Sequence, residues 1–185
     1  MKNKDIIKLL SSTASFMQLH GKNDFKIKSY TNAVYNLERI SQKLERLNLT
    51  ELEDIEGVGK SIAKAINEIN ETGNYDKLAN LKKNTPSDLL RLMKLRGIGA
   101  KKLNTLWFEL GIDSIELLSE AISKGNLKKL KGFGDKTIKN ISDVLAFAKE
   151  TEGFIHYANA EQLANEIKLK VEKEIPDVKI EFAGK

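Results

Sequence analysis

The feature that most constrains this sequence is a frame that occurs three times, each time around two glycines separated by one apolar residue. The three glycine pairs are Gly57 with Gly59, Gly97 with Gly99, and Gly132 with Gly134. In every copy, apolar residues stand five and two positions before the first glycine, and four and seven positions after the second. The last spacing is helical, so each copy predicts a tight turn that leads into a helix.

A helix, a glycine turn and a second helix together form a hairpin that suits an anion. The glycines permit backbone angles that a Cβ would forbid, and they allow another backbone to approach closely. The apolar residue between them (Val58, Ile98 or Phe133) is placed to fill the space between the two helices. The second helix presents free N–H groups and the positive end of its dipole at the turn. Such a turn predicts binding of a DNA phosphate without recognition of any base.

The charge around the turns differs between the copies. Residues 94–102 carry a net charge of +4 and residues 124–139 carry +5, whereas the first copy has Glu51, Glu53, Asp54 and Glu56 against Lys60. The second and third copies therefore predict phosphate binding by charge as well, and the first depends on backbone donors and nearby lysines. The candidate DNA-phosphate-binding residues are Gly57, Gly59, Lys60, Lys64, Gly97, Gly99, Lys101, Lys102, Gly132, Gly134 and Lys136.

The rest of the pattern predicts an all-α protein. Apolar residues recur at helical spacing, with helices expected over residues 6–19, 30–40, 89–93, 117–122 and 157–174. Strand-like alternation is clear at residues 178–182 near the end of the chain. Trp107 follows Leu103 and Leu106 at helical spacing, which favours packing over base stacking.

Composition excludes several classes of function. The chain of 185 residues has no cysteine, which excludes disulfides, thiolate zinc sites, iron–sulfur clusters and a cysteine nucleophile. Its two histidines, His20 and His156, are too few for most histidine-based metal sites. No apolar run is long enough to span a membrane, and the charged N-terminus is not a secretory signal, so we expect a cytoplasmic protein without a membrane partner.

Beyond the repeat, five segments carry a family resemblance. They are Gly21 to Ala33, Ile55 to Ala63, Glu71 to Gly73, Arg96 to Gly99, and Lys131 to Thr137. In this order and spacing they resemble the N-terminal half of family X DNA polymerases (the polymerase beta-like family), and particularly the bacterial form.

The resemblance implies a fold of two small helical domains with three helix-hairpin-helix motifs, followed by the start of an α/β palm. Residues 1–83 would form a lyase-like domain with the first hairpin, residues 86–150 a DNA-binding subdomain with the other two, and residues 151–185 a truncated start of the palm. In the family, two aspartates of the palm hold catalytic Mg²⁺, but no Asp-x-Asp pair occurs in these residues. We therefore expect a piece of a longer nucleotidyltransferase, and no polymerisation by this chain alone.

The function that the resemblance implies is sequence-independent binding of gapped, nicked or primer-template DNA, for gap-filling synthesis in base excision repair. No small-molecule cofactor is expected. The resemblance also implies that main-chain carbonyls of the hairpins could hold a monovalent cation, Na⁺ or K⁺. The carbonyls concerned are those of Glu53, Ile55 and Val58, of Met93, Leu95 and Ile98, and of Lys128, Leu130 and Phe133.

A 5′-phosphate pocket is implied at Lys26 and Tyr30, which match the family's contacts to the 5′-phosphate and its sugar. Both have another interpretation: Lys26 as ordinary surface charge, and Tyr30 as a core residue whose hydroxyl lies at the edge. No catalytic residue is assigned to this pocket.

Two alternative functions stay open. The first is a 5′-deoxyribose-phosphate lyase, which needs a lysine that forms a Schiff base with the sugar of an abasic site. The resemblance places Ala65 at that lysine's position, although Lys60 and Lys64 could substitute weakly or be merely solvated. The second alternative is a non-catalytic helix-hairpin-helix adaptor that binds a protein.

Overall fold

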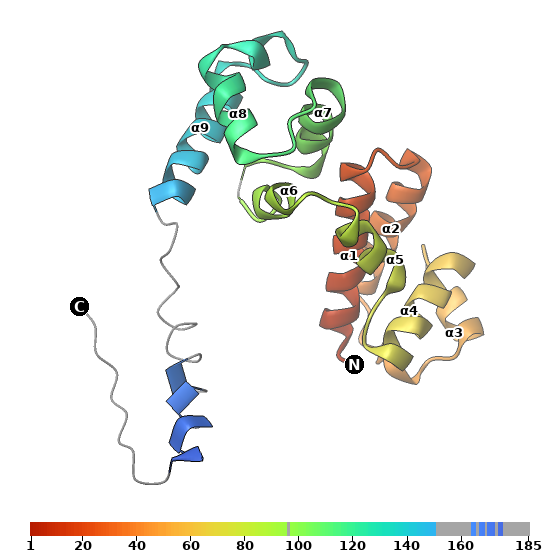
Figure 1. Ribbon diagram of the computed structural model, residues 1–185. Coiled ribbons are helices and arrows are strands. Elements are labelled where there is room, and N and C mark those ends of the chain that lie inside the picture. The colour runs from red at the N-terminus through yellow and green to blue at the C-terminus, as the bar shows by residue number, and fades with distance from the viewer. Residues whose placement is uncertain (96, 151–163, 166, 169, 173, 176–185) are drawn as a thin grey trace. The chain divides into compact units, whose positions relative to one another are not determined.

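The computed structural model describes residues 1–95, 97–150, 164–165, 167–168, 170–172 and 174–175 (Figure 1). Every regular element within these residues is helical, which confirms the all-α prediction. The α-helices are α1 (Asn3–Leu19), α2 (Asp24–Leu37), α3 (Leu49–Glu53), α4 (Lys60–Thr72), α5 (Asp76–Lys83), α6 (Ser87–Leu92), α7 (Ala100–Leu110), α8 (Ile115–Ser123) and α9 (Asp135–Glu150). The strand expected at 178–182, and most of the helix expected over 157–174, lie outside the described residues.

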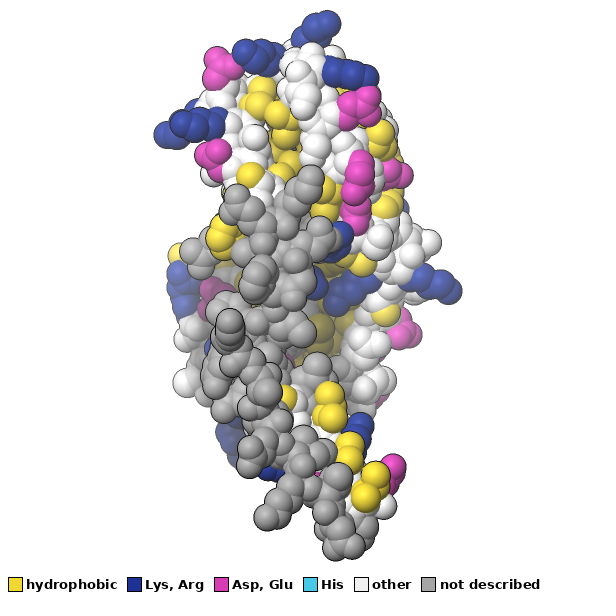
Figure 2. Space-filling model, turned by 60° about the vertical axis from the view of Figure 1, so that its left-hand side comes forward, with side chains coloured by type: hydrophobic (Ala, Val, Ile, Leu, Met, Phe, Trp, Pro, Cys, Tyr) yellow, Lys and Arg dark blue, Asp and Glu magenta, His cyan; other side chains and the backbone are white. Residues whose placement is uncertain are grey.

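The chain forms two compact units, residues 1–145 and residues 146–185, and all three glycine turns lie in the first. Within this unit, α1 packs against α2, α4, α5 and α7. Ile6, Leu10 and Leu19 of α1 have no exposed surface, so this helix forms the centre of the N-terminal core. Figure 2 shows lysine and arginine side chains projecting from the surface, with hydrophobic side chains visible between the charged ones.

The second predicted helix begins earlier than its apolar pattern indicated. α2 starts at Asp24 because Asn23 caps it: the Asn23 side-chain oxygen accepts hydrogen bonds from the amides of Phe25 at 2.9 Å and Lys26 at 3.3 Å. Residues 24–26 are exposed, so the buried apolar pattern of α2 begins only at Ile27, which the prediction left out. The helix ends at Leu37, three residues before the expected end at Ile40.

The end of α1 joins the N-terminal helices to the helices that follow. The Asn104 side-chain amide on α7 donates a hydrogen bond of 2.9 Å to the carbonyl of Leu19. The ring of Trp107 meets the ring of His20 edge-on, with centroids 5.3 Å apart, so Trp107 packs as expected. The boundary expected between residues 83 and 86 stays a prediction.

None of the described helices is long and apolar enough to cross a membrane.

Candidate nucleic-acid interface

The three glycine turns have the same backbone geometry at their first glycine. The φ angles of Gly57, Gly97 and Gly132 are +80°, +94° and +88°, in the left-handed region that side chains with a Cβ rarely adopt. The amide of the residue two positions before each of these glycines donates a hydrogen bond to a carbonyl of the preceding helical segment. In the first copy, the Ile55 amide donates to the Leu52 carbonyl at 3.3 Å. The sequence repeat is therefore a structural repeat.

At two of the turns, an asparagine side chain of another helix lies against the first glycine. The Asn36 side-chain amide on α2 donates a hydrogen bond of 2.7 Å to the carbonyl of Glu56, beside Gly57. A Cβ added to Gly57 would lie 2.7 Å from that amide nitrogen, and one added to Gly97 would lie 2.1 Å from the side-chain nitrogen of Asn140 on α9. The φ angle favours glycine at both positions, and a side chain there would also displace an asparagine.

The apolar residue between the glycines fills the corner in every copy. Val58, Ile98 and Phe133 are 3%, 3% and 2% exposed. The amides of Val58 and Phe133 close the turn on the carbonyls of Ile55 and Leu130, at 2.9 and 3.2 Å. This confirms the prediction that the residue between the glycines fills the space between the two helices.

The second glycine of each turn begins a helix whose first amides are open. The carbonyls of Gly59, Gly99 and Gly134 accept the first helical hydrogen bonds of α4, α7 and α9. None of the amides of these glycines and of the two residues after each donates a hydrogen bond within the described part of the chain, and no side chain caps α4 or α7. Since all six turn glycines are exposed, the donors are available to a ligand.

Among the described residues, no atom lies close to the position that a Cβ would take at the second glycine of any copy. A Cβ added to Gly59, Gly99 or Gly134 would meet nothing within 4 Å. The φ angles of Gly59 and Gly99 are −86° and −80°, which any residue adopts. Neither φ nor packing within the described residues requires a glycine there, so its small size matches the close approach of a partner.

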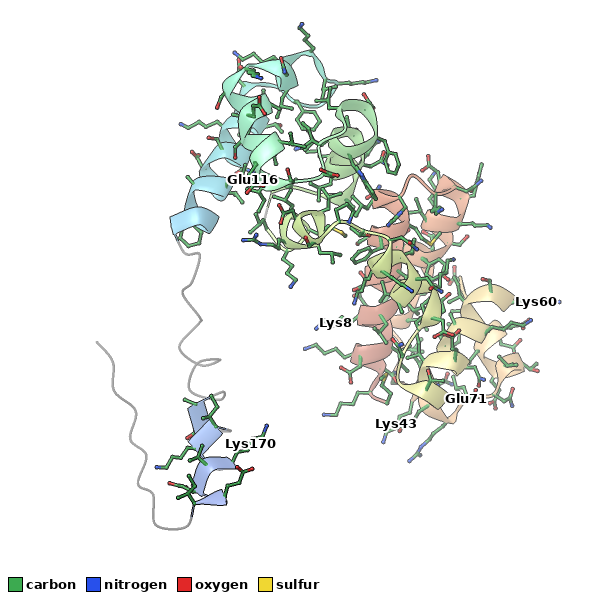
Figure 3. The ribbon with its side chains drawn as sticks, in the orientation of Figure 1. Lys8, Lys43, Lys60, Glu71, Glu116 and Lys170 are labelled. Atoms are coloured by element: carbon green, nitrogen blue, oxygen red, sulfur yellow. The ribbon has the colours of Figure 1, made fainter. Side chains whose placement is uncertain are left out.

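The candidate lysines lie on the helices that follow the turns. Lys60 and Lys64 line a cavity of about 470 Å³ together with Ser61, Ala65, Glu68 and Tyr75. Figure 3 shows Lys60 extending from the first turn of α4 into solvent. Lys101 and Lys136 are exposed, and Lys102 is half-buried. These five lysines make no ion pair among the described residues.

Acidic side chains distinguish the first and third turns. At the first turn, Glu51 forms a capping box with Asn48 at the start of α3, with hydrogen bonds of 2.8 and 3.0 Å, so this carboxylate has a structural role. At the third turn, Asp135 is the first residue of α9, next to the open amides, and its carboxylate pairs with Lys128 at 3.1 Å. Asp135 thus reduces the positive field at that site.

The predicted 5′-phosphate residues have different surroundings. Lys26 is exposed one turn before Tyr30, which is 3% exposed and belongs to the core. The hydroxyls of Tyr30 and Tyr75 lie 2.5 Å apart, and burial, reinforced by this hydrogen bond, raises the pKa of Tyr75. Tyr75 lines the Lys60–Lys64 cavity, so this pair of buried tyrosines begins at the edge of that cavity.

Sequence reasoning missed Lys77. Its ammonium group donates a hydrogen bond of 3.3 Å to the Tyr30 hydroxyl and lies 4.8 Å from the centre of that ring. An ammonium group next to Tyr30 adds positive charge to the predicted 5′-phosphate pocket. Nothing in the local sequence around Lys77 signals this contact, because Tyr30 is on another helix.

Among the described residues, no group of three or more His, Cys, Asp or Glu side chains is placed to hold a metal ion. The monovalent-cation prediction concerns main-chain carbonyls instead. The carbonyls of Glu53 and Met93 lie at the ends of α3 and α6, where helical carbonyls lack intrahelical partners.

Comparison with known protein families identifies the repeated unit. Residues 1–75 match the family model described as a helix-hairpin-helix domain, and residues 49–111 and 89–146 each match the model of a SAM-like helix-hairpin-helix tandem. The chain belongs to the helix-hairpin-helix family. Together the matches include all three glycine turns, so the helix-hairpin-helix assignment and the structural repeat agree.

A curated relative extends the comparison along the whole helix-hairpin-helix chain. The chain is 34% identical over 186 aligned residues to the DNA polymerase/3′-5′ exonuclease PolX of Bacillus subtilis (strain 168). The alignment covers 100% of this chain and 32% of that relative, so the chain spans about a third of its length. The resemblance to family X DNA polymerases is confirmed.

Proposed function

We propose that this chain binds DNA through its sugar-phosphate backbone, without recognising base sequence. One observation carries the proposal. In all three hairpins, the second helix begins with amides that donate no hydrogen bond among the described residues, and no described atom lies within 4 Å of a Cβ added to the glycine before it. Amides aimed at a phosphate bind it regardless of the base attached, and a glycine lets the strand approach them. The unpaired lysines after the turns add attraction that is likewise independent of sequence.

The preferred DNA would be gapped, nicked or primer-template DNA, bound as part of a family X polymerase in gap-filling repair. The cavity lined by Lys60, Lys64 and Tyr75 is suited to the phosphate end of a downstream strand. The Tyr75 hydroxyl is hydrogen-bonded to that of Tyr30, which Lys77 contacts in turn. The second and third hairpins would hold the continuous backbone elsewhere on the same DNA. Such an arrangement would keep a gap in place for the polymerase.

Fluorescence anisotropy with labelled gapped duplexes of two unrelated sequences tests this proposal. If the three hairpins neutralise roughly six phosphates, the logarithm of the binding constant falls against the logarithm of the salt concentration with a slope of about −5. We expect equal affinities and equal slopes for both sequences. A slope near zero, or a strong preference for one sequence, would contradict backbone recognition.

Lyase activity is a weaker proposal, because the residue at the expected nucleophile position is an alanine, which has no amine to form a Schiff base. Ala65 is 2% exposed, and Lys60 and Lys64 line the same cavity. Reduction with borohydride on an incised abasic duplex would trap a Schiff base on either lysine. We expect no adduct above that of the Lys60→Ala/Lys64→Ala variant, whereas a strong adduct lost in that variant would establish the lyase.

We also propose that a monovalent cation bridges hairpin carbonyls and a DNA phosphate. The position of the Glu53 and Met93 carbonyls at the ends of α3 and α6, where helical carbonyls lack intrahelical partners, supports this. Replacing K⁺ and Na⁺ by tetramethylammonium at constant ionic strength should weaken DNA binding, since the larger cation does not fit between carbonyls. Unchanged affinity would exclude the bridge.

A further inference from the structure

The second hairpin lies against a cavity that the sequence repeat does not predict. This cavity has a volume of about 540 Å³, within the range of ligand sites. Three separate segments of the chain line it: α1 contributes Ser11, Ser12 and Ser15, α5 contributes Lys82, and the segment that includes the second hairpin contributes Lys94 and Gly99. We call it the serine–lysine groove.

The polar groups of the groove are all suited to a phosphate. Lys82 and Lys94 are exposed, and neither makes an ion pair among the described residues. The described residues that line the groove include no aspartate or glutamate. Serine hydroxyls and lysine ammonium groups are common ligands of DNA phosphates, so the rim carries donors and positive charge without a competing carboxylate.

The floor of the groove is apolar. Phe16 of α1 and Ile98 of the second hairpin are 8% and 3% exposed, and Leu90 and Met93 lie beside them, half-buried. The floor offers no hydrogen bond to a base edge, but it can pack against the C–H face of a deoxyribose. Hydroxyls and ammonium groups over an apolar floor therefore match a sugar-phosphate unit better than an inorganic anion.

The groove is held together by contacts outside it. The hydrogen bond from Asn104 to the Leu19 carbonyl ties the end of α1 to α7. One turn away, the ring nitrogen Nε2 of His20 lies 2.8 Å from the Thr85 hydroxyl and 3.2 Å from the Leu81 carbonyl. These bonds fix α1 relative to the second hairpin, so the serines and the lysines keep a constant spacing.

We infer that the serine–lysine groove holds one sugar-phosphate unit of the DNA strand bound at the second hairpin, which makes α1 a DNA-contacting helix. The inference rests on the proposed function, because it assigns additional contacts to the same strand. It adds Ser11, Ser15 and Lys82 to the interface, and none of these belongs to a glycine hairpin.

The chain contains matched controls for these residues. Ser15 donates a hydrogen bond to the Ser11 carbonyl at 3.2 Å, and Ser123 on α8 does the same to the Ser119 carbonyl at 3.0 Å. The double variants S11A/S15A and S119A/S123A thus remove the same local bonds, but only the first touches the groove. Lys83 is an exposed neighbour of Lys82 on α5 that does not line the groove.

The test measures affinity for a gapped duplex by anisotropy, with thermal melting to verify folding. We expect S11A/S15A to weaken binding about fivefold, and K82A to weaken it and to reduce the magnitude of the salt slope by about one. The controls S119A/S123A and K83A should bind like the wild type. The inference is overturned if each groove variant matches its control while the wild type binds DNA.

Two further outcomes have distinct meanings. If the wild-type chain does not bind the duplex, the proposed function fails and the inference fails with it. If free deoxyadenosine monophosphate binds the wild type but not K82A, and the DNA affinity of K82A is that of K83A, the groove is a nucleotide site and the inference is wrong. We expect no Lys82-dependent binding of the free nucleotide.

Discussion

At the scale of single residues, the two glycines of a hairpin have different roles although they stand two positions apart. Gly97 has a φ of +94° and no room for a Cβ beside Asn140. Gly99 has an ordinary φ of −80° and open space in front of it. The first glycine is thus required by the fold, while the second is explained by a ligand that approaches it.

Alanine at the two positions should therefore give opposite results. We predict that Gly97→Ala lowers the free energy of unfolding by about 1–3 kcal/mol, because strain and a steric clash add. Gly99→Ala should change it by less than about 1 kcal/mol, yet weaken DNA binding about tenfold, equivalent to about 1.4 kcal/mol. Urea unfolding and anisotropy measure the two effects. Normal DNA affinity in a folded Gly99→Ala variant would argue against contact at this turn.

Asp135 offers a gain-of-affinity test at the third hairpin. Its carboxylate sits at the first position of α9 and pairs with Lys128. We predict that Asp135→Asn strengthens DNA binding about two- to fivefold, since it removes a negative charge next to the phosphate and frees a lysine. Asp113→Asn, at an exposed position before α8, is the control and should have no effect. An unchanged affinity of Asp135→Asn would place the DNA away from this turn, and weaker binding would contradict the predicted repulsion.

At the scale of elements, the sequence predicted features that depend on neighbouring residues, and it missed contacts between segments far apart in the chain. The turn-then-helix frame, the buried plugs and the all-helical class follow from spacing alone, and the structure has them. The start of α2 was missed because the prediction left out the buried Ile27, and because residues 24–26 after the Asn23 cap are exposed. Contacts such as Asn36 with Glu56, or Lys77 with Tyr30, depend on packing between helices, which spacing within one helix does not encode.

The titration of His20 tests how tightly α1, α5 and α7 pack where they meet. Burial lowers the pKa of His20 below its usual value of 6.5, and the charge of Lys22 lowers it further, while the hydrogen bond with the Leu81 carbonyl partly opposes this. Because the unfolded chain binds the proton more readily, stability is fully present above about pH 6.5 and declines as pH falls through the folded-state pKa.

We predict that the wild type loses more stability than His20→Gln between about pH 7.5 and about pH 5.5. Glutamine keeps an N–H donor for Thr85 but does not titrate in this range. Urea unfolding midpoints of both proteins, measured across that range, give the comparison. Parallel pH profiles would show that His20 is solvated and that the junction is looser than described.

At the scale of the whole molecule, the proposed DNA binding depends more on where the charged residues lie than on the net charge of the chain. The net charge of +5 is modest for 185 residues, and acidic residues surround the first hairpin. The open amides are shared by all three hairpins, whereas the strongly positive surroundings are confined to the second and third. The hairpin amides are therefore the common basis of the proposed DNA interface, and lysines modulate the affinity of each site.

The central claim is that these amides capture DNA phosphates. Amide chemical-shift changes in ¹H–¹⁵N spectra of the labelled chain, recorded on titration with a gapped duplex, test it most directly. We predict that the largest changes fall on Gly59, Gly99, Gly134 and the two residues after each. Saturable binding that leaves these amides unchanged, with the shifts elsewhere on the surface, would contradict the account.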